Sequence, residues 1–197
     1  METVLENVNE AKANEEIIEA HTRLMKVALG LEDSRSYWSN IADAKRTSDL
    51  VTVAFEGRWF GAKSIERVRM LLAHLSFRYD TFPEALKVLQ KWRTIDLNSM
   101  KLVCHLHLQL TDPLYRQFTG VFLPERREGH DLTIDRETVV RWIEQAYPER
   151  WQRPTKVKFA SNLLSICLEV GLLQSRRDPR TLVYPKVTAL GLGYLLY

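Results

Sequence analysis

The sequence has few cysteines, no long apolar run and no basic start. Its two cysteines, Cys104 and Cys167, lie far apart, so they form neither a zinc-binding pair nor a dense disulfide framework, and we expect a reducing compartment. The longest apolar run without charge, 187–197, has 11 residues, whereas a membrane-spanning helix needs about 20. Residues 1–20 hold six glutamates and one lysine, unlike a signal peptide. We therefore expect a cytoplasmic protein.

Catalytic signatures are also missing from the sequence. There is no phosphate-binding glycine-rich loop, no Gly-x-Ser-x-Gly elbow and no His-Glu-x-x-His motif. The run Cys104-His105-Leu106-His107 contains metal-ligating residue types, but side chains two positions apart on a helix point to different sides, so His105 and His107 cannot share one ion. We predict a protein that is not an enzyme and that has no cofactor and no metal site.

Basic residues are unevenly distributed along the chain. The net charge is only +3, but residues 150–186 contain eight basic and two acidic side chains. A local excess of this size favours a polyanionic partner such as nucleic acid. The alternative is a solvated basic surface that serves solubility alone.

The first 120 residues show the apolar spacing of a helical bundle. Ser64 is a suitable N-cap, and Ile65, Val68, Leu72 and Leu75 follow it at alternating three- and four-residue steps, which predicts one buried stripe. Residues 1–20 form an acidic leader. The expected helices cover 1–30, about 34–45, 49–57, 64–79, 83–92 and 98–110, and one more begins at Asp112-Pro113.

The last third of the chain has a different pattern. Residues 121–134 are polar and interrupted by proline and glycine, which is typical of a linker between domains. In 135–197, a helix capped by Thr133 or Asp135 and ending near Pro148 precedes a helix over 155–171. Two β-prone runs, 172–176 and 181–184, then flank an Asp-Pro turn and predict a hairpin.

These elements together predict a mainly α protein, with an N-terminal helical bundle over 1–120 and a winged helix-turn-helix-like module over 135–197 that carries a short β-hairpin. In such a module the second helix enters the major groove of DNA, and the hairpin reaches the adjacent backbone or minor groove. Lysine and arginine neutralise phosphates, and short polar side chains approach the groove floor. The predicted DNA contacts are Arg153, Lys156, Lys158, Ser161, Asn162, Arg176, Arg177 and Arg180.

A second basic set lies within the predicted bundle. Arg67 and Arg78 share one stripe of the helix over 64–79, together with His74. A solvated helix face with local ion pairs explains this set as well, and we prefer that interpretation. The possible second basic face comprises Lys45, Arg46, Arg58, Lys63, Arg67 and Arg78.

The chain resembles the BrxA family, small core components of BREX (bacteriophage exclusion) defence systems. The segments that carry the resemblance, within about 20–197, are Arg58-Trp59-Phe60-Gly61, the helix Ser64 to Tyr79 with Arg78, Phe82-Pro83-Glu84-Ala85-Leu86 leading to Trp92, and Leu163-Leu164 with Gly171-Leu172-Leu173. The resemblance implies a nearly all-helical globule and double-stranded DNA binding. It also implies action beside a methyltransferase, an ATPase and a phosphatase-like partner.

We therefore predict a non-catalytic, double-stranded DNA-binding component of a BREX-type phage-defence complex, which binds mainly through phosphates. Two alternatives remain open. One is an adaptor that binds other proteins of the same complex through exposed aromatic anchors among Trp38, Trp59, Trp92, Trp142 and Trp151. The other is an RNA-binding helical bundle that uses the face with Arg67 and Arg78.

Overall fold

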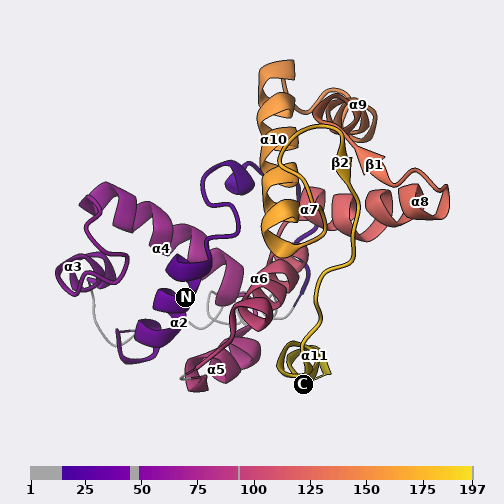
Figure 1. The fold of residues 1–197 in the computed structure, drawn as a ribbon. Coiled ribbons are helices and arrows are strands. Elements are labelled where there is room, and N and C mark those ends of the chain that lie inside the picture. Colours follow the sequence, from indigo (N-terminus) through magenta and orange to yellow (C-terminus); the bar gives the residue numbers. More distant parts are fainter. Residues whose placement is uncertain (1–14, 45–48, 93, 197) are drawn as a thin grey trace.

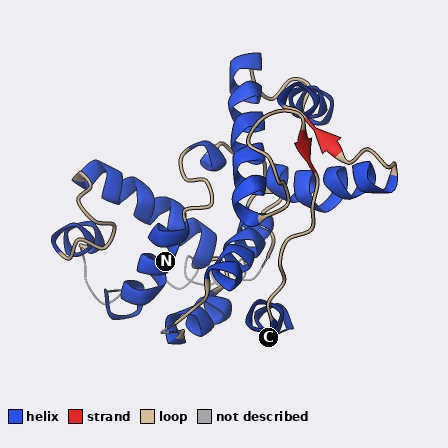
Figure 2. Cartoon of the chain, in the orientation of Figure 1, coloured by secondary structure: helices blue, strands red, loops and turns tan. Residues whose placement is uncertain are grey.

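The computed structural model describes residues 15–44, 49–92 and 94–196, and it is mainly helical, as predicted. Helices make up most of the described chain, and two short strands lie near α9 (Arg136–Ala146) and α10 (Arg153–Val170) (Figure 2). Within the described ranges, no helix combines the length and apolar character needed to cross a bilayer. The helices before residue 112 are η1 (Arg23–Met25), α2 (Leu31–Ala44), α3 (Leu50–Glu56), α4 (Ile65–Tyr79), α5 (Pro83–Lys91) and α6 (Leu97–Thr111).

Local capping chemistry sets several of these boundaries. The side chain of Asp49 accepts a hydrogen bond from the Thr52 N–H (3.1 Å), and that of Ser64 accepts one from the Arg67 N–H (3.3 Å). Pro83 occupies the first turn of α5, where its missing N–H costs nothing. The predicted starts of these three helices are confirmed.

The predicted helix over 1–30 is wrong for residues 15–30, where only η1 is helical; residues 1–14 lie outside the described part. Tertiary hydrogen bonds explain the difference. The Ile17 N–H donates to the Leu110 carbonyl (3.0 Å), and Arg116 Nη2 donates to the Ile17 carbonyl (2.8 Å). The buried Arg78 guanidinium donates hydrogen bonds to the carbonyls of Val27, Ala28 and Leu29. In a helix, these backbone carbonyls and the Ile17 N–H would form hydrogen bonds with other backbone groups of the same helix.

The C-terminal half begins with a continuous helical stretch that contains a π-helical turn. That stretch consists of α7 (Pro113–Gln117), η2 (Phe118–Phe122) and α8 (Leu123–Glu128). The elements that follow are β1 (Thr133–Ile134), α9 (Arg136–Ala146), α10 (Arg153–Val170), β2 (Arg180–Thr181) and α11 (Ala189–Leu196). Residues 121–134, which we expected to form a linker, thus contain α8 and β1. Leu123 and Ile134 belong to the core because their apolar side chains fall on the inner side of these elements.

The small sheet differs in detail from the predicted hairpin. The runs 172–176 and 181–184 do pair, but only through one bridge, Leu173 with Leu182, and neighbouring bonds such as Gln174 N–H to the Thr181 carbonyl (3.0 Å). The regular strands are β1 and β2, which are antiparallel with Thr133 opposite Thr181. The chain after α10 therefore folds back along that helix and adds β2 to β1 (Figure 1).

One apolar core extends through both halves of the molecule. Helices α4, α6 and α10 contribute fully buried side chains to it, among them Leu71, Leu75, Cys104, Leu163 and Leu164. Helix α6 contacts α4 on one side and α10 on the other, so it connects the N-terminal helices with the C-terminal ones. This packing fixes α10 and the loop that follows it relative to α6.

Candidate nucleic-acid interface

Helix α10 is the longest described helix, and its ends are set by proline and glycine. Pro154 lies in its first turn. Gly171 ends the helix in the left-handed conformation (φ 92°), and its N–H donates to the Cys167 carbonyl (3.1 Å). One side of α10, with Phe159, Ala160 and Leu163, packs into the core. Its other side, with Lys158, Ser165 and Glu169, is exposed.

An open groove with a volume of 820 Å³ runs along the outer side of α10. Ser161, Ser165 and Glu169 follow one another on that side at helical spacing, and Lys158 continues the same stripe toward the start of the helix. The lining residues are Lys101 from α6, Ser161, Ser165, Leu168 and Glu169 from α10, and Gln174, Arg176 and Arg180 from the following segment. The groove is therefore lined by residues from both halves of the molecule.

The loop at the edge of the groove is held by its own hydrogen bonds. Ser175 Oγ donates to the Arg177 carbonyl (2.9 Å) and accepts from the Arg177 N–H (3.1 Å). Asp178 accepts from Arg180 Nε (2.8 Å) and from the Arg136 N–H (3.1 Å). Partial desolvation alone would raise the pKa of Asp178, but these hydrogen bonds and the two arginine charges lower it below its usual value. The loop is thus anchored to the start of α9.

Arg176 and Arg177 project from this loop as exposed cations. No ion pair joins either guanidinium to a carboxylate of the described residues, and the same holds for Lys158 on α10. Arg180 differs, since its side chain is only 15% exposed and pairs with Asp178. Of the eight predicted contacts, Arg176 and the half-buried Ser161 therefore line the groove without an ion pair among the described residues, and Lys158 and Arg177 are exposed beside it.

Lys156 is not a surface residue, and its prediction as a DNA contact is wrong. It is 4% exposed, and its Nζ donates to the Pro148 carbonyl (2.8 Å). The helix begins at Arg153, and Lys156 lies three, four and seven residues before Phe159, Ala160 and Leu163, so it falls on the inner stripe. The ammonium group instead ties the turn after α9 to α10.

Two further predicted contacts are engaged within the protein. Arg153 lies between two carboxylates of α9, with Nη1 2.9 Å from Glu144 and Nη2 3.2 Å from Glu137. Asn162 Nδ2 donates to the Leu24 carbonyl of η1 (3.3 Å), because that side of α10 packs against η1. Arg153 is exposed but charge-compensated, and Asn162 is turned toward the N-terminal segment.

The second basic face does not form as predicted. Arg78 is 5% exposed and donates to three carbonyls at 2.8 to 3.1 Å, because its position on α4 faces the core and not solvent. Lys63 Nζ contacts Asp33 (2.9 Å) and the Phe60 carbonyl (2.6 Å). Arg58 and Arg67 are exposed, and Lys45 and Arg46 lie outside the described residues. His74, which lies between Arg67 and Arg78 on α4, is half-buried, and burial, followed by the Arg23 charge, lowers its pKa to about 4.

The two histidines of the Cys-His-Leu-His run have separate partners. His105 Nδ1 is 2.8 Å from the Tyr115 hydroxyl, and His107 Nε2 is 2.5 Å from the Tyr194 hydroxyl. Burial lowers the pKa of each imidazole to about 4, so both are neutral near pH 7. Among the described residues, no group of three or more potential ligands could hold a metal ion.

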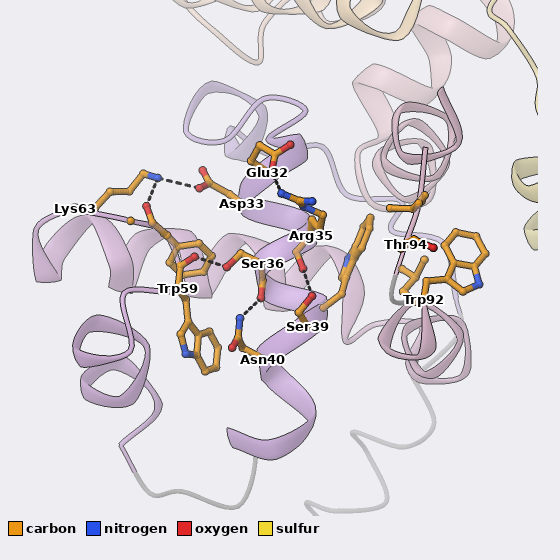
Figure 3. Close-up of a pocket in the computed structure, with 15 residues that line it drawn as sticks. Glu32, Asp33, Arg35, Ser36, Ser39, Asn40, Trp59, Lys63, Trp92 and Thr94 are labelled. Atoms are coloured by element: carbon orange, nitrogen blue, oxygen red, sulfur yellow. Dashed lines mark hydrogen bonds and ion pairs between the residues drawn. The ribbon is translucent and has the colours of Figure 1, made fainter. Parts of the chain in front are cut away.

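A second cleft, of 630 Å³, lies over α2 (Figure 3). Trp59 and Trp92 lie on different sides of α2 there, and Lys63 and Asp33 point toward each other at its edge. Trp38 also lines it. All five tryptophans are buried or half-buried, so none is a fully exposed anchor. Trp142 packs against Phe118 and Phe122, and Trp151 packs against Tyr147 and Phe159.

Lys101 and Glu169 are groove residues that sequence reasoning missed. Lys101 belongs to a helix of the expected N-terminal bundle, and only the packing of α6 on α10 brings it to the groove. Glu169 lies near the end of α10 and could have been found by extending the stripe Lys158, Ser161, Ser165 by one further turn.

The comparisons with known proteins bear on the fold. No family model and no curated protein matches the chain. A solved structure, the crystal structure of an uncharacterized protein from Magnetospirillum magneticum, is similar with a TM-score of 0.65 and 17% sequence identity. The similarity covers 90% of this chain and 92% of that chain. Two proteins with so little sequence in common thus share one fold.

Proposed function

We propose that this chain is a non-catalytic protein that binds double-stranded DNA, mainly through phosphate contacts, at the groove between α10 and residues 174–180. The observation that carries the proposal is a set of four cations with no ion-pair partner among the described residues. Lys101 and Arg176 line the groove, and the exposed Lys158 and Arg177 lie beside its lining residues Ser161, one turn away on α10, and Arg176. Cations without a local partner are free to neutralise phosphates.

The order of elements supports the same proposal. Strand β1, helices α9 and α10, and the segment that pairs through Leu173 and Leu182 follow in the order of a winged helix-turn-helix. In such modules the second helix and the hairpin tip approach the duplex from the same side. Helix α10 would then present its outer stripe to the major groove, and Arg176 and Arg177 would reach the neighbouring backbone.

We further propose, from the resemblance to the BrxA family, that the protein works in the cytoplasm within a BREX-type phage-defence complex. Its partners there would be a methyltransferase, an ATPase and a phosphatase-like protein. A non-catalytic DNA-binding subunit fits such a complex because it can hold the duplex while the enzymes act.

Fluorescence anisotropy with a labelled duplex of about two helical turns tests DNA binding. We expect saturable binding at low salt, competition by unlabelled duplexes of unrelated sequence, and weaker binding after Arg176→Ala with Arg177→Ala. Absence of binding at low salt would remove the proposal. Loss of affinity for one sequence only would show base readout in place of phosphate contact.

An adaptor function is the second candidate, and the cleft over α2 favours it. Trp38, Trp59 and Trp92 gather around that cleft, and its charged side chains pair with each other, Glu32 with Arg35 and Asp33 with Lys63. A neutral, aromatic-walled cleft suits a protein segment better than a phosphate backbone. Trp92→Ala should then abolish co-purification with a defence partner without changing DNA affinity. The RNA-binding alternative is weakened because Arg78, one of the two arginines on which it depended, is buried.

A further inference from the structure

The groove contains one carboxylate among its cations. Glu169 lies on the outer side of α10, one turn beyond Ser165, and shares the groove lining with Lys101, Arg176 and Arg180. It is exposed, and no described residue forms an ion pair with it. In a groove that receives phosphates, such a carboxylate faces charge of its own sign.

Like charges brought together at an interface weaken binding unless one of them is neutralised. Lys101 acts on Glu169 electrostatically without an ion pair between them. Arg180, which could have compensated Glu169, is held by Asp178 at 2.8 Å. No direct ion pair with a described residue therefore neutralises the Glu169 carboxylate, which lies in the same groove lining as Lys101 and Arg176.

We propose that Glu169 is an electrostatic gate of the groove: its ionised carboxylate opposes the seating of duplex DNA, and the duplex seats fully when this carboxyl group has taken up a proton from solvent. This inference rests on the proposed function. It predicts that DNA affinity rises as pH falls, with no preference for sequence, and that Glu169 is the group responsible.

The other charged groups around the groove are Lys101, Arg176 and Arg180, which line it, and Asp178, which pairs with Arg180. The pKa of Asp178 is lowered by its hydrogen bonds and by the neighbouring arginines. Partial desolvation raises the pKa of Glu169, and the Lys101 charge partly opposes this. Nearby phosphates would raise it further, since they disfavour a second negative charge.

The sign of the pH effect follows from linkage. DNA-bound protein holds its Glu169 proton more tightly than free protein does, so binding takes up a proton. Affinity is then highest below the free pKa of Glu169 and falls as pH rises from there to the higher pKa of the bound protein. Among the described residues no histidine lines the groove, so no imidazole there supplies the same response.

Anisotropy titrations at about pH 7.5 and about pH 5.5, at one fixed low salt concentration, test the gate. Glu169→Gln removes the charge and keeps the shape of an exposed side chain. At the higher pH this variant should bind every duplex about threefold or more tightly than the wild type, as expected for one charge removed a few ångströms from phosphates. Its affinity should change less with pH than that of the wild type.

Glu66→Gln is the matched control. Glu66 is exposed on the first turn of α4, away from the groove lining, and its substitution changes net charge by the same amount. It should leave both affinity and pH response as in the wild type. An equal gain in both variants would overturn the gate in favour of a general net-charge effect.

Three other results would also overturn the proposal. If Glu169→Gln binds no more tightly than the wild type while the wild type binds DNA, the gate fails and the proposed function stands. If Glu169→Gln loses affinity for particular duplexes only, Glu169 reads a base amine instead. If neither protein binds at either pH, the proposed function fails and the gate fails with it.

Discussion

The salt dependence of DNA binding gives a quantitative test of the groove. Two cations that line it, Lys101 and Arg176, and two exposed neighbours of its lining, Lys158 and Arg177, form no ion pair with the described residues. If each contacts one phosphate, the logarithm of the association constant falls against the logarithm of salt concentration with a slope of about −3.6, from roughly 0.9 for each contact. A fourfold rise in salt then weakens binding about 150-fold.

Replacement of Arg176 and Arg177 by alanine removes two of these contacts. The slope should fall to about −1.8, so that the same fourfold rise in salt weakens binding only about 12-fold. The assay is anisotropy with one duplex at four or five salt concentrations. Arg67→Ala with Arg69→Ala is the matched control, because both arginines are exposed on α4 and the same two charges are lost.

If the Arg176 and Arg177 variant kept the wild-type slope, the loop would make no phosphate contact and the proposed interface would be wrong. An equal loss of slope in the Arg67 and Arg69 variant would show a general net-charge effect, and a loss in that variant alone would place the interface on α4. A wild-type slope near −7 would show about twice as many contacts as the groove offers. In that case additional cations outside the groove would take part.

The remaining predictions concern the residues that the structure places in the interior. Lys156→Met should leave DNA affinity within about twofold of wild type in the same assay, since its ammonium contacts the Pro148 carbonyl and not solvent. Arg78→Met should lower the free energy of unfolding by about 3 kcal/mol or more in urea denaturation, because three carbonyls lose their donor. The folded-state pKa values of His105 and His107, about 4, lie below the usual 6.5, so protons favour the unfolded state. Unfolding free energy should therefore fall by on the order of 3 kcal/mol for each histidine between about pH 6.5 and pH 4, and constant stability over that range would contradict this.

Features that depend on neighbouring residues were predictable from the sequence. Ser64 and Asp135 begin helices and Gly171 ends one, as expected, because capping depends only on the capping residue and the nearest backbone groups. The mainly helical class followed from apolar spacing in the same way. The fold of 15–30 was not predictable by this route, since its carbonyls are taken by Arg116 and Arg78 from distant helices.

The candidate site was only partly predictable, for a similar reason. Arg176 and Arg177 were found because a loop between two short paired runs leaves its side chains in solvent. Lys156 was misplaced because the helix starts at Arg153, which turns Lys156 inward. Lys101 was missed because its place in the groove depends on how α6 packs against α10, which no local pattern in either helix encodes.

The eight basic side chains of residues 150–186 therefore overstate the positive charge that this segment can offer to a partner. Folding gives several of these cations an internal role: Arg150 with Glu19, Arg153 with Glu137 and Glu144, Lys156 with the Pro148 carbonyl, and Arg180 with Asp178. Of the cations that remain, Arg176 lines the groove, where Lys101 joins it from another part of the chain, and Lys158 and Arg177 are exposed next to lining residues. A DNA-binding surface that starts with few cations is sensitive to each single charge, which is why one carboxylate at position 169 should have a measurable effect.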